Sequence, residues 1–135
     1  MEFAAHILVV EDDVILRYTL AEWLRTHGYE VLEARSGDEA MTILSSVLIT
    51  DLVITDIQMP GTVDGYDLAG YIRKQFPALP VIMVSGNPSL QRIYEIGVSE
   101  FFYKPYDLDK ITTCVAGLLH QTKVATLKSK QVNDE

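Results

Sequence analysis

Short apolar runs alternate along the chain with amphipathic segments. The apolar runs are typical of buried strands and cover residues 6–10, 30–34, 52–55, 81–84 and 100–103. The amphipathic segments repeat apolar residues at helical spacing and cover residues 14–27, 36–47, 66–75, 89–96 and about 108–119. Strands and helices in strict alternation predict right-handed crossovers and a doubly wound α/β fold, a parallel sheet with helices on both faces.

Single residues support several of the expected helix ends. Ser36 and Glu39 have the spacing of a capping box, and Asp107 is a suitable N-cap for the last helix. Pro77 favours an end of the third helix at the residue before it. We therefore expect one domain over residues 1–120, followed by a polar, frayed tail at residues 121–135.

The composition narrows the class of protein. The chain has 135 residues and a net charge of −8, and a surface this acidic argues against nucleic acid as a direct partner. A single cysteine, Cys114, excludes an intrachain disulfide and makes a cytoplasmic location the default expectation. The N-terminus lacks the basic start of a signal peptide, and no apolar run is long enough to span a membrane.

Polar residues follow four of the five expected strands. The segment Glu11–Asp13 follows the first strand, Asp56 the third, Ser85 the fourth and Lys104 the fifth. Because the carboxyl ends of parallel strands meet at one edge of the sheet, these side chains should converge. Crowded carboxylates repel one another unless a cation binds, and Mg²⁺ takes oxygen ligands while leaving positions open for phosphate oxygens. A lysine and a hydroxyl would complete a phosphoryl site.

Each residue alone also has an ordinary interpretation. Acidic residues cap helices, so Glu11–Asp13 alone would indicate a helix start. Asp56 and Ser85 each suit a turn, and most lysines, Lys104 included, are solvated surface residues. The joint pattern favours the functional interpretation.

Four motifs resemble those of receiver domains of two-component response regulators. They are Val-Val-Glu-Asp-Asp at residues 9–13, Asp-Ile-Gln-Met-Pro-Gly at 56–61, Val-Ser-Gly at 84–86 and Lys-Pro-Tyr-Asp-Leu at 104–108. The resemblance extends over about residues 6–119. It implies a flavodoxin-like fold with five parallel strands in the order 2-1-3-4-5 and five helices. It further implies a switch that accepts a phosphoryl group on Asp56 from a histidine kinase or a histidine phosphotransfer protein.

The resemblance also assigns metal ligands. Glu11 and Asp12 match the acidic pair that holds Mg²⁺, while Asp13 lies one position beyond that pair and is not expected to be a ligand. Asp56 and the backbone carbonyl of Gln58 should supply further metal oxygens.

Three more residues match positions that handle the phosphoryl group in this family. Ser85 matches the hydroxyl that binds a phosphoryl oxygen, and Lys104 matches the lysine that pairs with the phosphorylated aspartate, typically before a cis proline bond. Phe101 occupies the position of the aromatic side chain that turns with Ser85 during the switch. With Asp56, Ser85 and Lys104 would catalyse only the protein's own phosphorylation and dephosphorylation.

Two other functions fit parts of the pattern. A phosphatase with an aspartate nucleophile needs a second acid two residues further on, where this chain has Gln58. A phosphorylation-independent docking module of the same fold usually lacks the acidic pair or the lysine, and both are present here. We expect no output domain after Leu119, and hence an unknown separate protein as the downstream partner.

Overall fold

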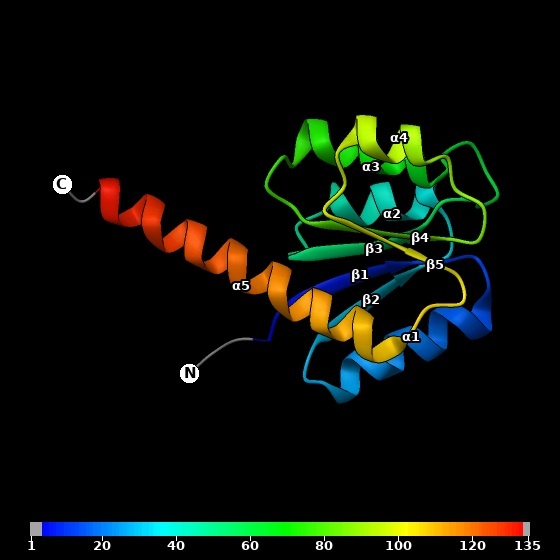
Figure 1. Ribbon diagram of the computed structural model, residues 1–135, viewed down its shortest axis with the longest axis horizontal. Coiled ribbons are helices and arrows are strands. Elements are labelled where there is room, and N and C mark those ends of the chain that lie inside the picture. Colours follow the sequence, from blue (N-terminus) through cyan, green and yellow to red (C-terminus); the bar gives the residue numbers. More distant parts are fainter. Residues whose placement is uncertain (1–3, 134–135) are drawn as a thin grey trace.

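The computed structural model describes residues 4–133 and consists of one five-stranded parallel sheet and five helices (Figure 1). The strands are β1 His6–Val10, β2 Glu30–Ala34, β3 Leu52–Asp56, β4 Val81–Ser85 and β5 Glu100–Tyr103. The helices are α1 Val14–Thr26, α2 Gly37–Leu44, α3 Gly65–Gln75, α4 Leu90–Ile96 and α5 Leu108–Asn133. The strand order β2-β1-β3-β4-β5 confirms the expected flavodoxin-like topology.

Helices cover both faces of the sheet, which is why its central strands are apolar except at their carboxyl ends. Every residue of β3 and β4 is buried. One core layer packs the sheet against α2, α3 and α4, and includes Leu8, Val10 and Ile72. The other packs it against α1 and α5, and includes Ile7 and Val9. Successive residues of β1 thus point to opposite faces, as strand geometry requires.

The register of the sheet brings the ends of the strands together. Val10 pairs with Thr55, Asp56 pairs with Val84, and Ser85 pairs with Tyr103. The residues that directly follow β1 and β5, and those that end β3 and β4, therefore lie at one edge. This edge is on the right in Figure 1.

The ends of α2 and α3 follow local signals. Ser36 caps α2 by accepting a hydrogen bond from the Glu39 backbone N–H at 3.1 Å. The helix ends at Leu44, earlier than the expected end near residue 47. The hydroxyls of Ser45 and Ser46 donate to carbonyls of its last turn, at 3.1 and 2.6 Å, and so satisfy groups that further helix would have used. Helix α3 ends at Gln75, as the following Phe-Pro pair predicts.

Helix α5 differs from the expectation at its C-terminal end. It continues to Asn133 and projects beyond the sheet, whereas a frayed tail was expected from residue 121 (Figure 1). Residues 121–133 contain neither glycine nor proline, and Lys, Gln, Ala and Leu among them favour helix. Among residues 4–133, no helix is both long and apolar enough to cross a membrane.

Candidate functional site

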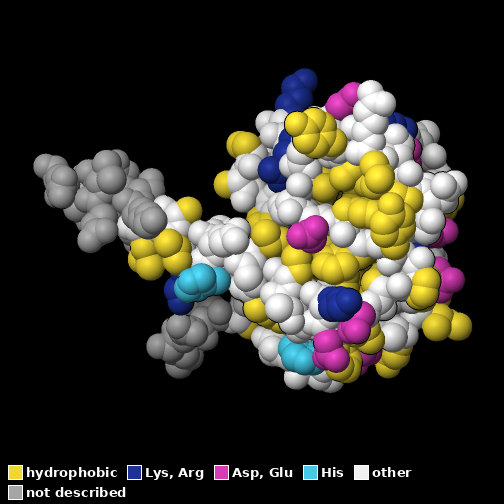
Figure 2. Space-filling view, in the orientation of Figure 1, with side chains coloured by type: hydrophobic (Ala, Val, Ile, Leu, Met, Phe, Trp, Pro, Cys, Tyr) yellow, Lys and Arg dark blue, Asp and Glu magenta, His cyan; other side chains and the backbone are white. Residues whose placement is uncertain are grey.

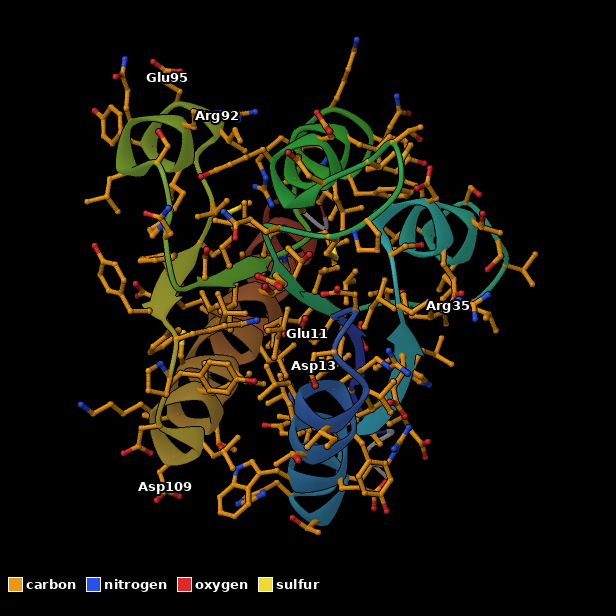
Figure 3. All side chains as sticks on the ribbon, turned by 90° about the vertical axis from the view of Figure 1, so that its right-hand side faces the viewer. Glu11, Asp13, Arg35, Arg92, Glu95 and Asp109 are labelled. Carbon is orange, nitrogen blue, oxygen red and sulfur yellow. The ribbon has the colours of Figure 1, made fainter. Side chains whose placement is uncertain are left out.

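Four polar residues meet at the edge of the sheet where the strands end. Glu11 is 4% exposed, Asp56 6% and Ser85 1%, while the Lys104 side chain is 21% exposed. They come from the ends of β1, β3, β4 and β5, as the sequence predicted. Figure 3 looks onto this edge and shows Glu11 near its centre, with Asp13 at the start of α1. Burial of this many polar groups is costly unless they pair with one another.

Lys104 joins the two buried carboxylates. Its Nζ donates to Glu11 Oε1 at 2.5 Å and to Asp56 Oδ2 at 3.0 Å. These bonds connect residues 93 and 48 positions apart in the chain. Burial alone would lower the pKa of Lys104, but its hydrogen bonds to Glu11 and Asp56 outweigh this and raise the pKa above its ordinary value. The ammonium group therefore stays charged at neutral pH.

Glu11 has the most perturbed acidity of the site. Burial, which disfavours the charged form, raises its pKa from 4.5 to about 7 despite the opposing hydrogen bond from Lys104, and the nearby charge of Asp56 raises it further. A negative charge at Glu11 is therefore only partly compensated by Lys104. Such a site favours an additional cation.

The backbone around Asp56 is tightly constrained. Asp56 Oδ1 accepts a hydrogen bond from the Ile57 N–H at 2.7 Å, which leaves Oδ2 directed at Lys104. The chain then returns at Gly65, whose N–H donates to the Ile57 carbonyl at 2.7 Å. A Cβ at Gly65 would overlap the Asp56 carbonyl oxygen, so only glycine fits this approach. The start of α3 is thus packed directly on the end of β3.

Three carboxylates at the edge could hold a metal ion. Oxygen atoms of Glu11, Asp12 and Asp56 all lie within 4.8 Å of one another, with Asp12 exposed and the other two buried. Carboxylate oxygens are the ligands that Mg²⁺ prefers, and an exposed side leaves room for water and phosphate oxygens. Asp13 instead caps α1, where its Oδ1 accepts from the Ile15 and Leu16 N–H groups at 3.0 Å. The carbonyl of Gln58 stays a predicted ligand.

Ser85 and Phe101 lie on neighbouring strands. Ser85 Oγ accepts a hydrogen bond from the Asn87 N–H at 3.2 Å, and the Ser85 carbonyl accepts from the Lys104 N–H at 2.9 Å. The half-buried Phe101 packs on the core and lies edge-on to Tyr103, with ring centres 4.8 Å apart. The Lys104–Pro105 bond is cis, as the resemblance implies. The switch roles of Ser85 and Phe101 stay predictions.

Arg17 belongs to the surroundings of the site, although no sequence motif indicates it. Its guanidinium donates to the Glu11 carbonyl at 2.9 Å and pairs with Glu33 of β2 at 3.3 Å. On an amphipathic helix an arginine is ordinarily a solvated residue, and only the packing of α1 on the sheet brings it to the end of β1. Arg17 therefore fixes the backbone from which Glu11 extends.

The strand order defines a domain of the flavodoxin-like class with a cluster of carboxylates at the edge of its sheet, and sequence comparison supplies its family. The family model described as the response regulator receiver domain matches residues 7–116. The chain therefore belongs to the response-regulator receiver family. Receiver domains act in two-component signalling as phosphorylation-dependent switches rather than classical enzymes, and they interact with histidine kinases or phosphotransfer proteins. The phosphatase and docking-module alternatives are not favoured.

Curated relatives agree with this assignment. The chain is 34% identical over 116 residues to the response regulator protein FleR of Pseudomonas aeruginosa, covering 84% of this chain and 24% of that protein. It is 35% identical over 119 residues to the aerobic respiration control protein ArcA of Escherichia coli, covering 87% and 49%. The chain thus spans about a quarter to a half of the length of these relatives.

Solved structures share the fold. The receiver domain protein (CheY-like) of Methanospirillum hungatei superposes with a TM-score of 0.85 at 24% identity, covering 91% of this chain and 99% of that one. NtrX of Brucella abortus, solved with ATP, gives a TM-score of 0.84 at 32% identity, covering 94% and 29%. The first of these likenesses concerns the fold alone.

Proposed function

We propose that Asp56 is the phosphoryl acceptor of this receiver domain. The observation that carries the proposal is the pairing of buried Asp56 Oδ2 with Lys104 beside a carboxylate cluster suited to Mg²⁺. Receiver domains bind Mg²⁺ at an acidic pocket, and the donor set here fits that ion. A histidine kinase or histidine phosphotransfer protein would supply the phosphoryl group. The setting would be the cytoplasm, and the acidic surface favours a protein rather than nucleic acid or a membrane as the partner of this domain.

The chemistry follows from the placement of these groups. A carboxylate oxygen of Asp56 forms a bond to phosphorus as the bond from phosphorus to the donor's histidine nitrogen breaks, and the departing imidazole takes up a proton. Lys104, charged at neutral pH, pairs with a phosphoryl oxygen and balances its charge. Glu11, Asp12, Asp56 and the Gln58 carbonyl would hold Mg²⁺, whose positive charge offsets the repulsion between carboxylates and phosphoryl oxygens.

Ser85 is suited to respond to the new group. Its oxygen accepts a hydrogen bond from Asn87, so its own proton is available for donation to a phosphoryl oxygen. Movement of Ser85 toward Asp56 would leave space into which the half-buried Phe101 could turn. The outer face of α4 and β5 would change with it.

Incubation with acetyl phosphate and Mg²⁺, followed by intact mass spectrometry, tests the proposal. We expect one added phosphoryl group that hydroxylamine removes, as expected of an acyl phosphate. Asp56→Asn should abolish the adduct. Asp51→Asn is the matched control and should label normally. Asp51 directly precedes β3, at the opposite end of the strand from Asp56, and its carboxylate accepts a hydrogen bond from the His6 N–H at 2.7 Å.

Three outcomes separate the candidate functions. A stable adduct dependent on Asp56 supports the switch, and continuous turnover of the donor would instead indicate a phosphatase. No labelling of the wild-type protein would indicate a docking module. Wild-type labelling of Asp56→Asn would show that another residue is the acceptor.

A further inference from the structure

A tyrosine at the start of α3 contacts the loop that follows β4. Tyr66 is 8% exposed, and its hydroxyl oxygen accepts a hydrogen bond of 2.7 Å from the Ser89 backbone N–H. The guanidinium carbon of Arg92 lies 3.9 Å from the centre of the Tyr66 ring, which is a cation–π contact. Figure 3 shows Arg92 on the side of α4 that faces α3. Tyr66 thus holds both the N-cap residue and the first turn of α4.

The same tyrosine is attached to the strand that carries the acceptor. Its neighbour Gly65 donates to the Ile57 carbonyl at 2.7 Å and leaves no room for a Cβ beside Asp56. The start of α3 therefore cannot shift without disturbing the end of β3. The backbone of Tyr66 is therefore held in place relative to the end of β3.

The loop between Ser85 and Ser89 has fewer restraints. The sheet holds its near end, where Ser85 pairs with Tyr103. The Ser85 side chain bonds its own loop at the Asn87 N–H, 3.2 Å away. Around Gly86, no atom outside the adjoining residues lies within 4 Å of the position that a Cβ would take. Movement of the loop is thus limited chiefly by the contacts at its far end.

We propose that the contacts of Tyr66 with Ser89 and Arg92, here called the Tyr66 latch, hold the β4–α4 loop in its unphosphorylated arrangement. The inference rests on the proposed function of Asp56. For Ser85 to turn toward a phosphoryl group, the loop shifts and the latch opens. Tyr66 is therefore a positioning residue that sets how readily the site closes on its phosphoryl group.

Opening of the latch also releases the N-terminus of α4. This short helix carries Leu90 and Tyr94, which are 55% and 87% exposed. Figure 2 shows apolar side chains gathered on the face formed by α4, β5 and α5. The latch thus connects the phosphoryl site to an exposed apolar surface, through contacts that a ligand at Asp56 can bias.

Beryllofluoride binding in the presence of Mg²⁺, measured by isothermal titration calorimetry, tests the latch, because this ion mimics a phosphoryl group without covalent chemistry. Tyr66→Phe removes the hydroxyl and keeps the ring. We expect a dissociation constant about fivefold lower than that of the wild type, the effect of one net hydrogen bond. Arg92→Ala should lower it by a smaller factor. Tyr71→Phe, on the same helix but with its ring packed on Phe76, should leave it unchanged.

The outcomes distinguish the latch from the proposed function. Failure of the wild-type protein to bind beryllofluoride would overturn both. Wild-type binding with equal or weaker binding by Tyr66→Phe would overturn the latch alone. A loss of stability in urea without a change in affinity would assign Tyr66 a purely structural role and would likewise overturn it.

Discussion

Glu11 should destabilise the metal-free protein at neutral and alkaline pH. The residue is 4% exposed, and its pKa rises from 4.5 to about 7, mainly because burial disfavours the carboxylate. The folded state therefore binds a proton at Glu11 more tightly than the unfolded state does. The contribution of protonated Glu11 to the free energy of unfolding is fully present below pH 4.5 and is lost as the pH rises through about 7.

Glu11→Gln is the perturbation that measures this effect. One pKa unit corresponds to about 1.4 kcal/mol, so the full rise to about 7 corresponds to ~3 kcal/mol at alkaline pH. Glutamine keeps an oxygen that accepts from Lys104 but gives up the charge that strengthened that bond. We therefore expect the variant to be more stable than the wild type by ~1–2 kcal/mol at about pH 8, and equally stable at about pH 4.

Urea unfolding in the presence of EDTA provides the assay. Glu22→Gln, an exposed change that alters the pair with Arg25, serves as the control and should shift stability by less than about 0.5 kcal/mol. Added Mg²⁺ should stabilise the wild type more than Glu11→Gln, since the variant lacks one of the carboxylates proposed to hold the ion. A variant that is equally stable or less stable at about pH 8 would refute the reasoning.

Three further predictions concern the edge of the sheet. Asp12→Ala should weaken Mg²⁺ binding at least tenfold without loss of stability. Asp13→Ala should instead cost ~1 kcal/mol of stability through the lost helix cap and leave Mg²⁺ binding intact. Calorimetry and urea unfolding measure the two effects, and the reverse pattern would contradict both assignments. Lys104→Met should slow phosphorylation by acetyl phosphate about a hundredfold, and unchanged labelling kinetics would contradict its role in charge balance. Gly86→Thr fits the open space around Gly86 and should prolong the lifetime of the phosphorylated form by shielding it from water, an expectation that equal decay rates would disprove.

The sequence determined the elements of this fold and the positions of its chemistry. Strand and helix periodicities extend over only a few residues, so all ten elements could be located from the chain alone. A capping residue such as Ser36 interacts within one helical turn, so the sequence also predicted the start of α2. Because parallel strands end at a common edge, the sequence also predicted that Asp56 and Lys104 lie close together.

Other features depended on contacts between distant segments. The resemblance separated the adjacent acids Asp12 and Asp13, but only the structure places an oxygen of Asp12 within 4.8 Å of those of Glu11 and Asp56. Likewise, Tyr66 and Ser89 are 23 positions apart, and only the packing of α3 beside α4 brings them to 2.7 Å.

The acidity of the site and the path of α5 were also decided by tertiary structure. The raised pKa of Glu11 follows from its burial beside Asp56, and burial is a property of the assembled sheet rather than of the residue. The helix beyond residue 120 continues from an α5 whose Ile111 and Val115 are anchored in the core, and such propagation is easier than starting a new helix. Local periodicity fixes what forms, whereas burial and register fix which groups meet and how they ionise.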